Sequence, residues 1–160
     1  MSERKRHVRH NLIVTIVICL AVSFAFSLTI ARNSLFGSIP LQNWFNHQGW
    51  PAIQQIRNDN TAVNQIMPSS TRNNTRIAQA CARGYRDAQT DLTEPPPDPT
   101  IGVSWNSYFN HAELAFQDCV LAATNNNANL GHRSNNEMAA AEWSFRSLSL
   151  ELSAAGVERP

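Results

Sequence analysis

Four carboxylates of this chain have a spacing that comes closest to that of a binding site. Asp87, Asp91, Glu94 and Asp98 follow one another in steps of four, three and four. The first two share a helical face. Negative charge at a helix C-terminus opposes the helix dipole, so a divalent cation or a basic partner could hold these groups together. The opposing interpretation is a solvated acidic helix end, because calcium sites usually draw their ligands from a compact loop containing glycine. We therefore predict no metal site and keep the four residues as candidates for binding a cation or a basic partner.

The other reactive side chains lack a setting for catalysis. Three histidines, His47, His111 and His132, lie in the C-terminal four fifths of the chain, and no two of them have metal-ligand spacing on one helix. His111 borders the apolar face of its segment, which favours a place at the edge of a core. The sequence has no nucleophile elbow, no HExxH or SxxK motif and no glycine-rich phosphate loop. We expect neither an enzyme nor a bound cofactor.

Residues 12–31, LIVTIVICLAVSFAFSLTIA, are uncharged and follow a basic leader, residues 1–11. Twenty helical residues span about 30 Å, which is the thickness of a bilayer core. The leader holds four basic residues and one acidic residue, whereas Arg32 alone follows the run directly. By the positive-inside rule, the N-terminus is cytoplasmic and the rest of the chain is extracytoplasmic. The pattern predicts a single-pass plasma-membrane protein with a signal-anchor.

A cleavable signal peptide is the alternative, in which the protein is secreted. Small-x-small sites would allow cleavage after Ala25 or Ala31. The full run is longer than the ~7–15 apolar residues of a typical signal. Trp44, Phe45 and Trp50 lie close behind it as candidate membrane-interface anchors. These features favour a retained anchor, and both interpretations export the remainder of the chain.

Export changes how the cysteines are interpreted. Cys19 lies inside the apolar run, and Cys81 and Cys119 are the two cysteines that follow it. An even count in an oxidising compartment favours one disulfide between them. Two free thiols in a reducing compartment are the alternative, and the absence of a CxxC motif argues against a redox-active pair. A disulfide closing this loop would contribute ~4 kcal/mol on the chain-entropy account.

The remainder of the chain shows the periodicity of helices. In the last segment, apolar residues recur at steps of three and four, after a capping-box pattern that begins at Ser134 and before a stop at Gly156. Nothing between residues 50 and 156 alternates with the period of two that a strand needs. The four segments with helical periodicity cover about residues 51–67, 71–92, 104–124 and 134–156.

The connectors predict how these helices are arranged. Residues 93–102, TEPPPDPTIG, form a stiff link that cannot continue a helix, and residues 125–131, NNNANLG, form a turn. Short connections between amphipathic helices predict an all-α antiparallel bundle over residues 51–156, followed by a tail at residues 157–160. The disulfide would join the second and third helices. The aromatic juxtamembrane segment, residues 32–50, would either lie along the membrane surface or pack as a collar on the bundle.

Charge and exposed apolar residues narrow the function. The formal net charge is +1, and nothing in it suggests a nucleic-acid partner. Trp143 and Leu150 fall off the apolar stripe of the last helix, so they form a candidate partner surface. We expect a non-enzymatic, membrane-anchored accessory or structural subunit of a cell-envelope or membrane assembly, with a protein partner. The alternative is an exported helical module that binds a small apolar ligand or lipid.

Overall fold

The computed structural model of the protein describes residues 40–66 and 74–158. These residues form four long α-helices and no strand, which confirms the all-helical prediction. None of the described helices is both long and apolar enough to cross a membrane. The predicted leader and signal-anchor, residues 1–31, lie outside the described residues.

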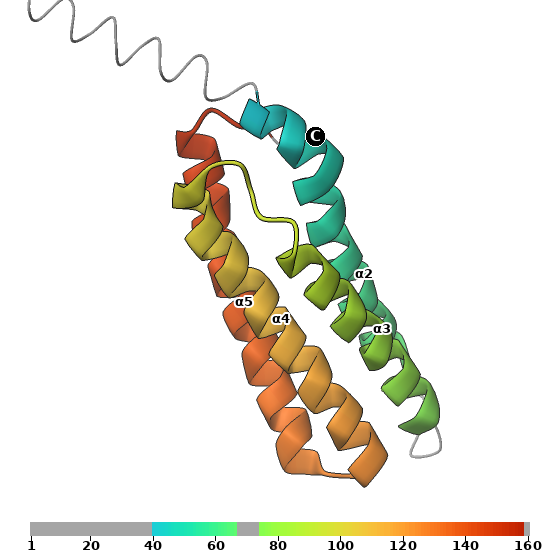
Figure 1. The fold of residues 1–160 in the computed structure, drawn as a ribbon. Helices are drawn as coiled ribbons and strands as arrows, with labels where there is room; N and C mark the ends of the chain where they lie inside the picture. Colours follow the sequence, from blue (N-terminus) through green and yellow to red (C-terminus); the bar gives the residue numbers. More distant parts are fainter. Residues whose placement is uncertain (1–39, 67–73, 159–160) are drawn as a thin grey trace, which may run out of the picture. The chain divides into compact units, whose positions relative to one another are not determined.

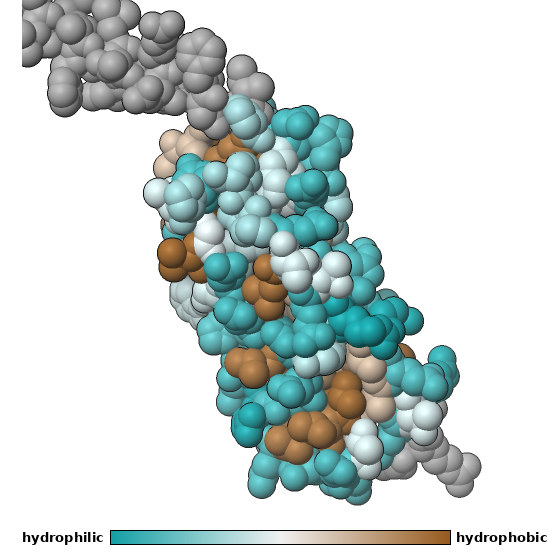
Figure 2. Space-filling model, in the orientation of Figure 1, coloured by the Kyte–Doolittle hydropathy of each residue, from teal (hydrophilic) through white to brown (hydrophobic). Residues whose placement is uncertain are grey.

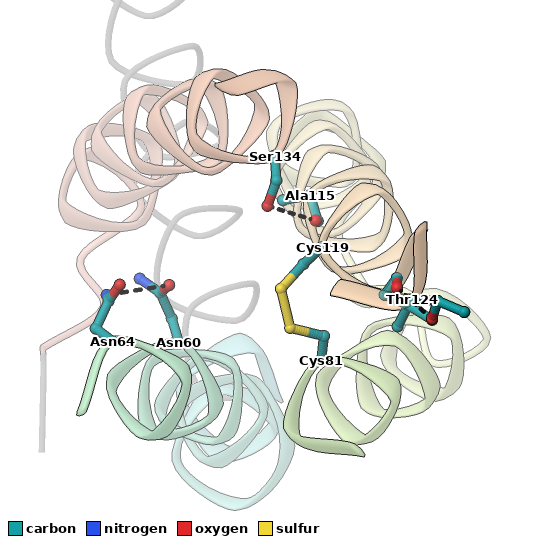
Figure 3. The surroundings of a disulfide bond; sticks show 8 residues. Asn60, Asn64, Cys81, Ala115, Cys119, Thr124 and Ser134 are labelled. Atoms are coloured by element: carbon teal, nitrogen blue, oxygen red, sulfur yellow. Dashed lines mark hydrogen bonds between the residues drawn. A yellow bond between two sulfur atoms is a disulfide. The ribbon is translucent and has the colours of Figure 1, made fainter. Parts of the chain in front are cut away.

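The four helices follow an up-and-down course. Figure 1 shows each helix running antiparallel to the next, with α5 returning beside the helical segment at the start of the described chain. Helix α3 packs on α2 and α4, and α4 packs on α5. In the view along the bundle, the four helices surround a common centre (Figure 3). Their bounds are α2 Trp50–Ile66, α3 Asn74–Leu92, α4 Pro99–Asn125 and α5 Ala128–Ala154.

Helix α4 begins earlier than the sequence predicted, because the proline-rich link also contains a helix start. The Asp98 carboxylate accepts hydrogen bonds from the Thr100 backbone N–H at 2.9 Å and from its hydroxyl at 2.7 Å. Pro99 occupies the first helical position, where a backbone N–H would have no intrahelical partner. Ile101 is thereby brought into the core. The prediction that residues 93–102 cannot be helical was therefore wrong from Pro99 onward.

Helix α5 also begins earlier than predicted. Its cap is Asn127, whose side-chain oxygen accepts from the N–H groups of Asn129 and Leu130 at 3.0 and 3.3 Å. Asn126 before it takes the left-handed conformation that closes the turn, with φ 51°. The expected cap at Ser134 was wrong, since its hydroxyl instead donates to the Ala115 carbonyl of α4 at 2.8 Å.

The described part of the juxtamembrane segment belongs to the bundle. Residues 40–49 are helical and continue directly into α2. Within them, Phe45–Gly49 forms a π-helical turn, η1, in which the Trp50 N–H bonds to the Phe45 carbonyl. Pro51 explains this wide turn, because proline has no N–H to donate and its ring clashes with the carbonyl four residues earlier.

The core is aromatic at the end where the chain enters it. Trp105, Tyr108 and Phe109 of α4 are almost fully buried. The Trp44 ring meets Trp105 edge-on, with 5.0 Å between ring centroids. Phe45 is 1% exposed, so the segment before α2 contributes apolar surface to the core that the four predicted helices would lack.

The predicted disulfide is present and joins α3 to α4 through Cys81 and Cys119 (Figure 3). The same two helices approach closely at Gly84. A Cβ atom there would lie 2.5 Å from the buried Phe116 ring, so only glycine fits. Polar rungs connect α4 to α5 on the other side: Ser104–Glu151, Ser107–Ser144, His111–Glu137 and Asp118–Arg133.

The ends of the packed domain are clasped together. The Gln42 side-chain amide donates to the Glu158 carbonyl at 2.8 Å and accepts from the Glu158 N–H at 2.7 Å. Gly156, with φ 76°, turns the chain after α5. Val157 then donates back to the Leu152 carbonyl at 2.9 Å and is buried, as in a Schellman-type helix end.

Candidate partner surface and cavity

Trp143 and Leu150 lie two turns apart on α5 and point away from the core. Their exposed fractions are 68% and 73%, whereas Phe145 and Leu148 between them are buried. The Arg146 guanidinium lies 4.8 Å from the Trp143 ring centroid, a cation–π contact that helps orient the indole on the surface. We call Trp143, Arg146 and Leu150 the α5 surface.

Helix α4 carries exposed apolar residues that the sequence reasoning missed. Val103, Leu114 and Leu121 are 74%, 43% and 41% exposed. Their spacing of eleven and seven residues places them on one stripe opposite the core. Figure 2 shows the face of the bundle on which α4 lies. Hydrophobic residues (brown) on this face are separated by hydrophilic ones (teal) along much of the length of the bundle. The spacing of these residues is visible in the sequence. It is hard to recognise there, because α4 also carries a wide stripe of apolar residues that face the core.

The three candidate membrane anchors pack against the core of the bundle. Phe45 is buried, and Trp44 and Trp50 are half-buried against the core. Phe45 also packs on Trp50, with 5.9 Å between ring centroids. This arrangement fits the collar interpretation of the segment, and the buried Phe45 ring is not available to a membrane surface.

The four acidic candidates do not form a metal site. Among the described residues, no group of three or more His, Cys, Asp or Glu side chains is placed to hold a metal ion. Asp98 caps α4, and its hydrogen bonds with Thr100 lower its pKa. Asp87 accepts from the Gln55 side chain at 3.1 Å. Burial raises the pKa of Asp91 to about 6, and the charges of Asp87 and Glu94 add to this rise.

The sequence reasoning missed Asp59, a buried carboxyl that faces the acidic end of α3. It is 4% exposed, and one of its oxygens, Oδ2, has no hydrogen-bond partner among the described residues. Burial raises its pKa to about 6, and neighbouring Asp87 adds to the rise. The Arg83 Nε, 3.4 Å from Asp59 Oδ1, acts in the opposite direction. A signal was present, since Asp59 lies between the apolar positions Ile56 and Val63 of α2.

His111, the histidine that borders the core, pairs with a carboxylate of the same chain. His111 Nδ1 lies 2.7 Å from a Glu137 carboxylate oxygen across the α4–α5 seam. Both side chains are about one-third exposed. The pair can tie the two helices together, and its second member comes from the segment that was predicted to cap α5.

A cavity of about 530 Å³ lies beside the α4–α5 turn. Its apolar walls include Val63, Ile77, Phe116 and Met138, which come from all four helices. Its rim is rich in asparagine, including Asn60, Asn64, Asn126, Asn127 and Asn135. We call this feature the amide-rimmed cavity. Its rim is open to solvent, because four of these five asparagines are exposed.

Comparison with known proteins finds no protein family, no curated protein and no solved structure similar to this chain.

Proposed function

We propose that this protein is a non-enzymatic, membrane-anchored accessory subunit that docks on a protein partner of a cell-envelope or membrane assembly. The observation that carries the proposal is the outward-facing Trp143 and Leu150 of α5. Tryptophan is enriched among residues that dominate binding energy, and burying an exposed indole against a partner removes a large apolar surface from water. Arg146 beside it adds a second residue type that is common in such sites.

Two further features support an extracytoplasmic location. The uncharged run of residues 12–31 has the length of a membrane span and follows a basic leader. The Cys81–Cys119 disulfide is typical of a compartment that does not reduce thiols. The domain thus belongs outside the cytoplasm, held by its N-terminal anchor.

The anchor is tested by the intact mass of the native protein. We expect it to remain with the membrane at the full mass of the chain, less the two hydrogen atoms lost in the disulfide. Recovery in the soluble exported fraction, lighter by the mass of residues 1–25 or 1–31, would show that the leader is a cleaved signal.

The partner surface is tested by site-specific photo-cross-linking in the native membrane. A photoreactive residue at Trp143 should give one dominant cross-linked protein, and Trp143→Ala combined with Leu150→Ala should release that partner on purification. Val103 is the matched control, because its exposure of 74% on α4 is close to that of the two apolar residues of the α5 surface. Equal cross-linking from positions 103 and 143 would show that any exposed position reaches neighbouring proteins. That result would contradict the proposed docking face.

A carrier of small apolar molecules is the second candidate function. A large closed apolar cavity would favour it, whereas the cavity observed here is open and has a polar rim. The accessory role is therefore the function we propose, and the cavity calls for a different kind of ligand.

A further inference from the structure

We propose that the amide-rimmed cavity binds a small neutral amphipathic molecule, with an apolar body and a hydroxyl or amide head. The cavity volume of about 530 Å³ falls in the range of small-molecule sites, which in helical bundles lie between the helices. It shares no residue with the α5 surface, so this inference is independent of the proposed docking function.

The walls would hold the apolar body of the ligand. Val63 and Phe116 are buried at 5% and 2% exposure, and Ile77 and Met138 pack against the core beside them. A ligand that covers these side chains removes their remaining apolar surface from water, and this favours binding in proportion to the area covered. Methionine among them adapts to irregular ligand shapes.

The rim would hold the head group through amides. Figure 3 shows Asn60 and Asn64 side by side on α2, across the bundle from Ser134 on α5. The bond from Asn64 Nδ2 to Asn60 Oδ1 is long, at 3.4 Å, so it is weak and leaves both amides ready to bond a ligand. Asn135 of α5 adds an amide with no hydrogen-bond partner among the described residues. Each amide both donates and accepts, which suits a hydroxyl or an amide.

The charge of the lining selects a neutral ligand. None of the described residues that line the cavity is Asp, Glu, Lys or Arg, and among them His132 is the one titratable side chain. A charged head group at the rim would therefore find no ion partner among the described lining residues, whereas a neutral hydroxyl or amide is satisfied by the asparagine side chains. The nearby Arg133 is already paired with Asp118, on the α4–α5 seam.

The disulfide makes one wall rigid. Cys119 lines the cavity and is bonded to Cys81, so α3 and α4 are held together at this level (Figure 3). A wall that is already ordered does not have to be ordered by the ligand, and this lowers the cost of binding.

The test uses the full-length chain in phosphatidylcholine nanodiscs with [13C-methyl]methionine. The chain has three methionines, and Met138→Leu identifies the signal of the one that lines the cavity. The neutral probe is 1-monooctanoylglycerol, and octanoate and octyltrimethylammonium are charged probes of the same chain length. We expect the neutral probe to shift the Met138 signal in a saturable way. The charged probes should bind at least about tenfold more weakly, a difference of about 1.4 kcal/mol.

Two matched variants locate the binding. Ala123 lines the cavity, so Ala123→Trp should fill it and abolish the saturable shift. Ala139 is exposed on α5 outside the lining, so Ala139→Trp should leave binding unchanged. Asn64→Leu, which is close in size and removes an amide, should weaken the neutral probe and not the charged ones. Circular dichroism and the retained disulfide confirm that each variant is folded.

Three results would overturn the inference. They are a Met138 signal that does not saturate with the neutral probe, charged probes that bind as tightly as the neutral one, and a folded Ala123→Trp variant that binds as the wild type does. Each of these leaves the cross-linking test of the α5 surface unaffected.

Discussion

Asp59 shares the space between α2 and α3 with other ionisable groups. Asp87 is its neighbouring carboxyl, and Arg83 supplies one positive charge at 3.4 Å. Asp87 also acts on Asp91, which lies one helical turn further along α3. When either Asp59 or Asp87 is protonated, its O–H can donate to the other carboxylate, and this interaction favours the protonated form of Asp59. Burial and like charge act in the same direction, and this is why the raised pKa values occur here.

The first prediction concerns the pH dependence of stability. Because the folded-state pKa of Asp59, about 6, exceeds its ordinary value of 3.8, the folded protein holds a proton that the unfolded chain has released between these pH values. The free energy of unfolding should therefore fall as pH rises from about 4 to 7, by roughly 2–3 kcal/mol from this group. Chemical unfolding at a series of pH values measures the slope.

Asp59→Asn should reduce the slope, because an amide has no proton to lose. The slope that remains comes from Asp91, whose pKa is also raised to about 6. Asp98→Asn is the matched control, since Asp98 is only partly buried and asparagine also caps helices well. The lowered pKa of Asp98 makes its own contribution to stability disappear only as pH falls below 3.8. An unchanged slope in Asp59→Asn would contradict the assignment.

At the scale of the helices, α3 and α4 can approach closely because Gly84 has no side chain. The Phe116 ring occupies the space over Gly84, and Cys81 of the disulfide lies less than one helical turn before this glycine on α3. The close approach is local. At Gly102, near the start of α4, an added Cβ would meet no described heavy atom within 4 Å apart from its chain neighbours and the backbone of its own helix.

The second prediction compares alanine at these two glycines. Gly102→Ala should stabilise the protein by roughly 0.5–1 kcal/mol, because alanine favours a helix where space is open. In Gly84→Ala the same gain is outweighed by overpacking against Phe116, at a cost of about 1–3 kcal/mol. Urea unfolding of both variants gives the difference. If both substitutions stabilised the protein, α3 and α4 would be further apart than described.

The interiors of the helices and the disulfide were predictable from the sequence, and the helix starts were not. Periodicity depends on residues that repeat, so the stripe through Phe145 and Leu148 identified α5 over several turns. A start depends on one cap, and Asn127 lies in a run of three asparagines of which any could serve. The π turn before Pro51 was hidden because it disturbs the period that would have revealed the helix.

A candidate site was predictable from the sequence only where all of its residues lie on one helix. Trp143 and Leu150 are off the apolar stripe of a single helix, and that pattern is visible in the sequence. The closeness of Asp59 to Asp87 depends on how α2 packs on α3, and the cavity depends on four helices at once. Such features need the relative positions of helices, which local spacing does not contain.

At the scale of the whole domain, the Cys81–Cys119 disulfide cross-links its two halves in addition to the backbone. The helical segment of residues 40–66 and α3 form the first half in chain order, and α4 and α5 form the second. The cross-link spans a sequence separation of 38 residues. It therefore restricts the unfolded chain where the fold passes from one helix pair to the next.

The third prediction is that replacing both Cys81 and Cys119 by alanine lowers the free energy of unfolding by about 4 kcal/mol. A reducing agent should destabilise the wild type by a similar amount and leave the double variant unchanged. Thermal unfolding with and without the reductant measures both effects. Equal stability of the reduced and oxidised wild type would show that packing alone fixes the α3–α4 contact.

The clasp between Gln42 and Glu158 has a consequence for the order of the chain. Since both ends of the domain already meet through two hydrogen bonds, a short linker could join them and new termini could be opened at the Asn126–Asn127 turn. The permuted chain would keep every helix neighbour while reversing which pair of helices is synthesised first. In that chain the two former ends would be joined at one end of the bundle, and the new termini would lie at the other, at the α4–α5 turn (Figure 1).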